Sequence, residues 1–235
     1  MSRLITYFCS FGYSGSHHPD ADTMMDRNDA APNKIAKHYG LELVNKSKSG
    51  TNMHQQFASI IKDVDDGFID TQHDKILVQW TFPGRCFSVD KTKASHSIGG
   101  ADYSGNNSIQ HIKWYYENIY DEELAKGQLL SYANACHDIL KGNIYQGFIT
   151  GSDELTNCHS TGRPRKVNKC LYDNIMHKIN NVSFKKFIVD ELKENVHPTD
   201  SIYPCNHPTD IGHEYITNHY INKIWFSSFS ARSVK

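Results

Sequence analysis

The sequence predicts an α/β protein, a three-layer α/β/α sandwich with a mainly parallel central sheet. Four short apolar runs are predicted to be strands, and the first of them, rich in β-branched and aromatic residues, has the composition of a strand that is buried on both faces. These runs are 4–9, 41–44, 75–80 and 143–150. Segments with apolar residues at helical spacing lie between them, and alternation of this kind is typical of a parallel sheet covered by helices on both faces.

The first half of the chain supplies the two clearest helices. The run from Leu4 to Cys9 is expected to be a central strand, and a long polar loop follows it. Pro32 suits a first helical turn because its φ is fixed and it has no N–H to leave unpaired, and Gly40 is a typical helix end. A second amphipathic helix is predicted from Thr51, with apolar residues at helical spacing. They are Met53, Phe57, Ile60, Ile61 and Val64.

The second half is more irregular. Residues 87–107 are rich in Ser, Gly, Lys and Asp and are expected to form no regular element. Residues 108–140 hold two helical stretches that break near Tyr120 and Asp121. Shorter helices are predicted at 171–179 and 184–192. A last helix, opened by Pro208, is predicted to continue through Ile224.

Length and composition limit the kind of protein. At 235 residues, the chain is expected to fold as a single domain, 1–235. The net charge of −1 and the absence of a long basic run argue against a nucleic-acid partner, and no apolar run reaches the roughly 20 residues that span a bilayer. The first residues lack the apolar core of a signal peptide, and the cysteines form no C-x-x-C pair. We therefore expect a cytoplasmic protein with reduced thiols and neither metal nor cofactor.

Three loops follow the carboxyl ends of predicted strands, where parallel sheets bind their ligands. They begin at Cys9-Ser10, at 45–50 and at 81–85. A fourth feature is His207, which stands just before the last predicted helix. If a nucleophile faces the same cleft, His207 is a general base; otherwise it is a capping or packing residue.

These features, taken in order, resemble the sequence blocks of SGNH (GDSL-like) hydrolases. The matching segments are Phe8-Cys9-Ser10-Phe11-Gly12, Asn45 to Asn52 and His207 to His213, so the likeness covers most of the chain. It implies a flavodoxin-like sandwich, with Ser10 as nucleophile and His207 as catalytic histidine. It also implies that the Gly50 N–H donates to the oxyanion at the start of a helix. A second register, Gly12-Tyr13-Ser14, makes Ser14 the other candidate nucleophile.

The chain departs from the family pattern at three places. Phe8 stands where the first block has a glycine, and Pro204 and Cys205 stand where an aspartate precedes the histidine. The third block lacks its asparagine. Its sequence, Gln79 to Arg85, is similar to a phage-associated set with Trp-Thr/Ser-x-Pro-x-Arg, in which Thr81 or Arg85 would face the site.

The resemblance implies an esterase or deacetylase that uses a Ser-His dyad on O-acyl esters of a small molecule or a glycan. The similarity of the third block to phage proteins further implies that the protein is located in the cytoplasm of a host cell or is associated with a viral particle. The altered blocks leave open an SGNH-fold binding or structural protein of a virion or tail. A metal-dependent hydrolase is a further alternative, based on the repeated His-Pro-Thr-Asp at His197 to Asp200 and His207 to Asp210, although no H-E-x-x-H motif supports it.

Overall fold

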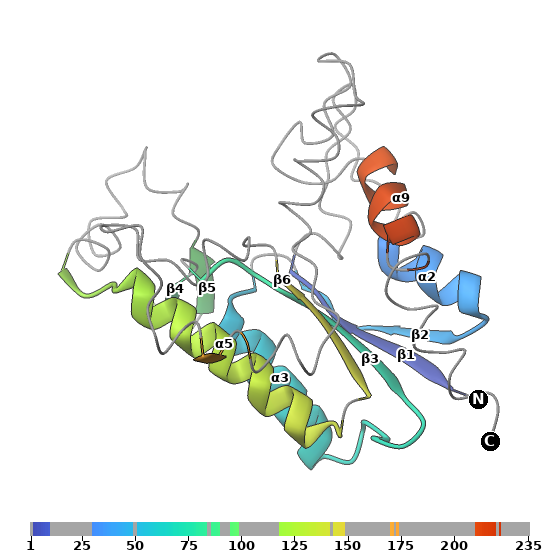
Figure 1. Cartoon of the computed structure of the whole chain (residues 1–235), viewed down its shortest axis with the longest axis horizontal. Coiled ribbons are helices and arrows are strands. Elements are labelled where there is room, and N and C mark those ends of the chain that lie inside the picture. Colours follow the sequence, from blue (N-terminus) through green and yellow to red (C-terminus); the bar gives the residue numbers. More distant parts are fainter. Residues whose placement is uncertain are drawn as a thin grey trace.

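The computed structural model contains a parallel four-stranded sheet in the order β2-β1-β3-β6 (Figure 1). The strands are β1 (Arg3–Tyr7), β2 (Glu42–Asn45), β3 (Lys75–Trp80) and β6 (Ile144–Phe148). The structure describes residues 2–9, 30–48, 51–83, 86–89, 95–98, 118–141, 143–148, 170, 171, 173, 210–219 and 221. The four predicted strands and their parallel arrangement are confirmed.

Helices cover both faces of this sheet. Figure 1 shows α3 (Met53–Asp65) and α5 (Glu122–Ile139) on one face, and α2 (Ala31–Tyr39) and α9 (Asp210–His219) on the other. The chain passes from β1 through α2 to β2, then returns through α3 to β3 on the far side of β1. The strand order therefore reverses between β1 and β3, and this reversal is the topological switch point where such folds bind ligands.

The ends of α2 and the start of α3 follow from local sequence. Pro32 lies in the first turn of α2, and Gly40 ends the helix with φ of 62° while its N–H bonds to the carbonyls of Ala36 and Lys37. A left-handed φ of this kind is easiest for glycine. α3 begins with a capping box, in which Asn52 and Gln55 exchange side-chain to backbone hydrogen bonds of 2.9 and 3.1 Å.

α5 begins where the sequence predicts a break. Asp121 is its N-cap, and its carboxylate accepts hydrogen bonds from the N–H groups of Glu123 and Leu124 at 2.9 and 3.0 Å. A carboxylate at this position also interacts favourably with the positive end of the helix dipole. The boundary predicted near Tyr120 and Asp121 is confirmed.

The main apolar core lies between the sheet and the pair α3 and α5. Alternate residues of β1 and β3 point into it, and residues from both helices meet them. Its fully buried members include Ile5, Ile76, Val78, Trp80, Ile60, Leu129, Leu130 and Ala133. On the opposite face, Leu4, Ile35 and Ile216 are also buried. Both faces of the sheet are therefore covered, as the apolar strand runs predict.

The expectation of an irregular 87–107 segment is wrong for 87–89 and 95–98, and the rest of that segment lies outside the described residues. β4 (Cys86–Val89) and β5 (Ser95–Ile98) pair antiparallel, with Cys86 opposite Ile98. Each strand has four residues, and Ser95 to Ile98 contains one aliphatic residue among polar ones, so neither gives a clear strand pattern.

Several other predictions lie outside the described residues. These are the helical stretch within 108–117, most of 171–179, and 184–192. Among the helices that the structure describes, none combines the length and apolar character needed to cross a membrane.

Candidate active site

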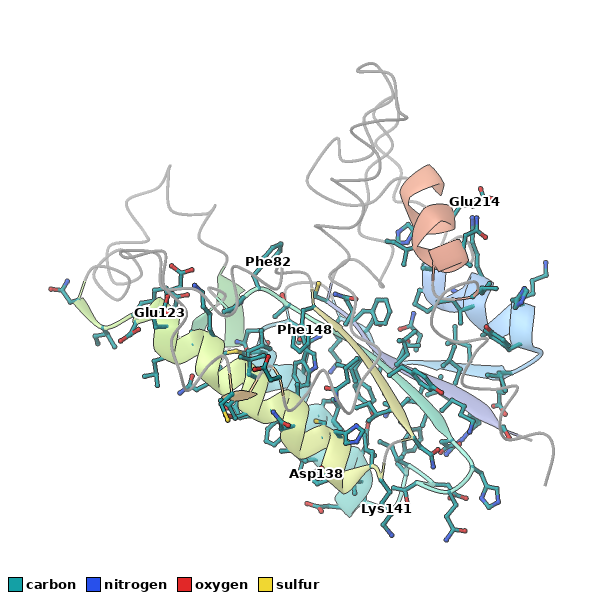
Figure 2. The ribbon with its side chains drawn as sticks, in the orientation of Figure 1. Phe82, Glu123, Asp138, Lys141, Phe148 and Glu214 are labelled. Carbon is teal, nitrogen blue, oxygen red and sulfur yellow. The ribbon has the colours of Figure 1, made fainter. Side chains whose placement is uncertain are left out.

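The candidate site lies at the carboxyl edge of the sheet. Figure 2 labels Phe82 and Phe148, which follow β3 and end β6 at this edge, whereas Asp138 and Lys141 lie toward the opposite edge of the sheet. Of the site residues that the sequence predicts, Thr81 is described. The others, Ser10, Ser14, Gly50, Arg85 and His207, lie outside the described residues.

The segments that lead to Ser10 and Gly50 run side by side. Past the end of β2, the Lys46 N–H donates to the Thr6 carbonyl in β1 at 2.9 Å, and the Lys48 N–H donates to the carbonyl of Phe8, just after β1, at 3.1 Å. Phe8 and Lys48 are each two residues before the predicted site residue. The parallel pairing thus brings together the two chain segments from which the predicted nucleophile and oxyanion donor follow.

Polar side chains support this extended pairing. The Phe8 N–H donates to Ser47 Oγ at 3.0 Å, in a buried position. Asn45 Oδ1 accepts from Thr6 Oγ1 at 2.9 Å and from the Ser47 N–H at 3.0 Å. Because buried backbone groups are costly to leave unpaired, these bonds define the path of both segments.

Thr81 is the first residue after β3 and is fully buried. Its N–H donates to Gln56 Oε1 at 3.1 Å. Its hydroxyl, Thr81 Oγ1, has no hydrogen-bond partner within the described part of the chain. An unpaired buried hydroxyl is uncommon in native structures and requires an explanation. At this edge of the sheet, an oxyanion or another ligand atom is a chemically suitable partner.

The helix that follows His207 is anchored to the start of α2. His213 is fully buried on α9, and its Nδ1 accepts a hydrogen bond from the Ala31 N–H at 3.2 Å. The N-cap of α2, Ala30, has no side chain that can cap the helix, so His213 satisfies one of the free N–H groups of this helix from across the fold. The described helix α9 begins at Asp210, three residues after His207.

One buried acid that contacts β1 has partners of its own. Asp63 on α3 accepts a hydrogen bond from the Tyr7 hydroxyl at 2.6 Å and lies 3.3 Å from Lys46 Nζ. Burial, and then the hydrogen bond to Asp63, raises the pKa of Tyr7 far above its usual value. Tyr7 is therefore a neutral donor, and Asp63 is part of a structural ion pair.

A metal centre has no support in the described residues. No group of three or more His, Cys, Asp or Glu side chains is arranged there to hold a metal ion. The repeated His-Pro-Thr-Asp segments, on which the metal-dependent alternative depends, lie outside the described residues apart from the backbone of Asp210.

Gln56 is a residue near this site that was not predicted from the sequence. It lies on α3 and is 2% exposed, and it bonds to the backbone of both β1 and β3. The signal was present, because Gln56 occupies the apolar stripe of α3, three residues after Met53 and four before Ile60. A polar residue within such a stripe is either buried with partners or unfavourable.

No protein-family model matches the chain, and no curated protein matches it by sequence. Solved structures do match its fold. One is a member of the lipolytic protein G-D-S-L family from Veillonella parvula, with 13% identity, a TM-score of 0.51, and coverage of 95% of this chain and 98% of that one.

Two other solved structures match over similar lengths. A variant of an acetyl xylan esterase from Geobacillus stearothermophilus shares 16% identity and a TM-score of 0.53, over 95% of this chain and 94% of the esterase. An α/β hydrolase enzyme from the metagenome of Lake Arreo, Spain, shares 15% identity and a TM-score of 0.52, over 93% of both chains. The chain therefore has the α/β fold of these G-D-S-L lipolytic and acetyl xylan esterase structures.

Proposed function

We propose that this protein is a serine hydrolase of O-acyl esters, with Ser10 as nucleophile and His207 as general base. The observation that carries the proposal is the convergence of three segments at the carboxyl edge of the sheet. β1 leads to Ser10, the extended β2 segment leads to Gly50, and β3 ends at the buried, unpaired hydroxyl of Thr81. The fold shared with esterases is consistent with this chemistry.

In the proposed reaction, Ser10 Oγ attacks the acyl carbonyl while His207 accepts the serine proton. The carbonyl oxygen becomes an oxyanion, which the Gly50 N–H and the Thr81 hydroxyl stabilise by hydrogen bonds. The tetrahedral intermediate expels the alcohol, which takes the proton from His207, and leaves an acyl group on Ser10. Water, deprotonated by His207, then releases the acid and restores the serine.

The catalytic pair is proposed to act as a dyad. Pro204 and Cys205 stand where the family has an aspartate, so no side-chain carboxylate in those positions orients the imidazole. A backbone carbonyl that accepts from Nδ1–H leaves Nε2 available to take the serine proton. Arg85 is proposed to bind the substrate, and the acetyl xylan esterases of the same fold suggest an acetyl group on a glycan.

The experiment is acetate release from p-nitrophenyl acetate and acetylated xylan by the purified chain. We expect turnover by the wild type and a loss on the order of a thousandfold or more in Ser10→Ala and His207→Ala. Ser14→Ala is the matched control, because it removes the competing candidate for the nucleophile and should retain activity. Turnover that survives Ser10→Ala would contradict the proposal.

The second candidate is a binding or structural protein of a phage particle that has the fold without the chemistry. The altered first, third and last blocks favour it. It predicts a folded wild type with no esterase activity on either substrate, and it would be supported by cosedimentation of the chain with viral particles.

A further inference from the structure

A buried glutamine joins the two strands at the switch point. Gln56 Nε2 donates to the carbonyl of Tyr7, at the end of β1, at 3.3 Å and to the carbonyl of Gln79 in β3 at 2.8 Å. Its Oε1 accepts from the Thr81 N–H at 3.1 Å. One neutral side chain from α3 therefore contacts three backbone groups from two neighbouring strands.

This contact lies where the two strands separate. The register of β1 against β3 ends with Tyr7 opposite Val78, whereas on its other edge β3 pairs with β6 as far as Trp80 opposite Phe148. Gln56 bonds to backbone groups at and just beyond that last pair, so it extends the connection between β1 and β3 past the sheet ladder. Each of these buried groups is costly to leave without a partner, so the side chain strongly favours one spacing of the two strand ends.

Both ends lead into the proposed site. Ser10 follows Tyr7 by three residues, and Thr81 itself carries the unpaired hydroxyl. We propose that Gln56 is a positioning residue, which holds the Ser10-bearing end of β1 at a fixed distance from the Thr81 hydroxyl. This inference rests on the proposed ester hydrolysis. It adds a residue that does not contact substrate but determines how two groups that do so are placed.

Packing alone does not explain the glutamine. The neighbouring stripe residues of α3, Met53 and Ile60, are apolar and buried, and methionine would occupy nearly the same volume at position 56. The amide is needed only for the three backbone groups. The substitution Gln56→Met therefore removes these hydrogen bonds with little change in the shape of the side chain.

The test compares two buried glutamines. Gln146 on β6 is 1% exposed, donates to the Ala133 carbonyl at 2.9 Å and accepts from Trp80 Nε1 at 2.7 Å, but it lies within the sheet. Gln56→Met should lower kcat on p-nitrophenyl acetate about 10- to 100-fold with little change in KM, because misplacement affects the transition state most. Gln146→Met loses a similar number of bonds and should change kcat by no more than about twofold.

A double-mutant cycle identifies the partner through which Gln56 acts. If Gln56 acts by placing Thr81, then Gln56→Met should lower kcat much less in a Thr81→Val background than in the wild type. If Gln56→Met does not fold, Gln56→Glu replaces it. A protonated glutamate keeps an oxygen that can accept from the Thr81 N–H, but it has one O–H to donate where the amide donates to two carbonyls. Circular dichroism confirms that each variant is folded.

Two results would overturn the inference while leaving the proposed function intact. One is an equal loss of kcat in both backgrounds, and the other is an equal loss in Gln146→Met, which would indicate a general effect on stability. A folded wild type without Ser10-dependent esterase activity would instead contradict the proposed function, and this inference with it.

Discussion

Among single residues, Thr81 shows most clearly how a proposed functional group can lower the stability of the fold. Its N–H is paired with Gln56, yet its buried Oγ1 has no partner within the residues that the structure describes. An unpaired buried hydroxyl lowers stability by about 1–3 kcal/mol relative to a well-packed apolar group. A residue with such a cost and no structural benefit is typical of a functional site.

Removal of the Thr81 hydroxyl should therefore have opposite effects on stability and on activity. Thr81→Val keeps the shape of the side chain and removes the hydroxyl, so it should raise the free energy of unfolding by about 1 kcal/mol and lower kcat by roughly tenfold or more. Urea unfolding and ester hydrolysis measure the two quantities on the same preparation. A fall in both would mean that the hydroxyl has a structural partner.

The described cysteines differ in their environment. Cys9 and Cys136 are fully buried, whereas Cys170 is exposed. Burial raises the pKa of Cys136 to about 12, so its thiol stays protonated and unreactive at neutral pH. In the folded protein, iodoacetamide should modify Cys170 and leave Cys9 and Cys136 untouched, as read by peptide mass spectrometry. Rapid labelling of Cys136 without denaturant would show that this part of the core opens readily.

Among the elements, α9 links the segment of the proposed catalytic histidine to the fold, in part through a hydrogen bond from α2. His213 caps α2 through the Ala31 N–H, and Thr217 Oγ1 donates to the His213 carbonyl one turn earlier at 2.7 Å. His207 precedes this helix by three residues, so the position of α9 affects where the imidazole can lie. The anchor is therefore expected to influence catalysis without contacting the substrate.

Replacing the anchor tests this connection. His213→Ala leaves the Ala31 N–H without its partner and opens a cavity, so kcat/KM for ester hydrolysis should fall about tenfold or more while the fold persists. Glu214→Ala is the matched control, because Glu214 is the next residue on α9 and is exposed (Figure 2). Equal kcat/KM values for the two variants would show that α9 does not position His207.

The contact between α3 and α5 contains a group that responds to pH. His54 Nδ1 lies 2.9 Å from the Tyr132 hydroxyl, and Phe57 stacks on the Tyr132 ring at 4.3 Å. Burial lowers the pKa of His54 below its ordinary value of 6.5, because desolvation disfavours the charged imidazolium. The unfolded chain thus binds a proton at a pH where the folded chain does not.

The sign of the pH effect follows from this difference. The neutral His54 contributes fully above the unfolded pKa, near 6.5, and its contribution falls as the pH drops toward the lower pKa of the folded state. Replacement by glutamine keeps a hydrogen-bonding group but removes the titration. The free energy of unfolding of the wild type should therefore decline more steeply from pH 7.5 to 5 than that of His54→Gln, measured by urea titration. Parallel declines would argue against the lowered pKa.

For the whole molecule, apolar patterning was sufficient to predict the sheet, because strands buried on both faces cannot contain many polar residues. The beginnings of α2 and α5 were also predictable, since Pro32 and Asp121 act locally. The β4–β5 hairpin was not, because its four-residue strands alternate too weakly. Gln56 and His213 depend on contacts between distant segments, which no local pattern contains.

The candidate site was predictable to a similar degree. The strand ends that lead to Ser10 and Gly50 lie together as a parallel sheet requires, and Thr81 lies at the end of β3. The roles of Ser10, Gly50, Arg85 and His207 remain predictions from the resemblance, since these residues lie outside the described part of the chain. Measurements of activity on variants at these positions test those roles.

The proposed function requires that Ser10 is an activated nucleophile, and labelling with a fluorophosphonate tests this requirement, because such probes react with activated serines and not with ordinary hydroxyls. We expect a single adduct on Ser10 in the folded wild type, found by peptide mass spectrometry. The adduct should be absent in Ser10→Ala, strongly slowed in His207→Ala and unchanged in Ser14→Ala. A folded wild type that takes no label, or labelling that persists in Ser10→Ala, would contradict it.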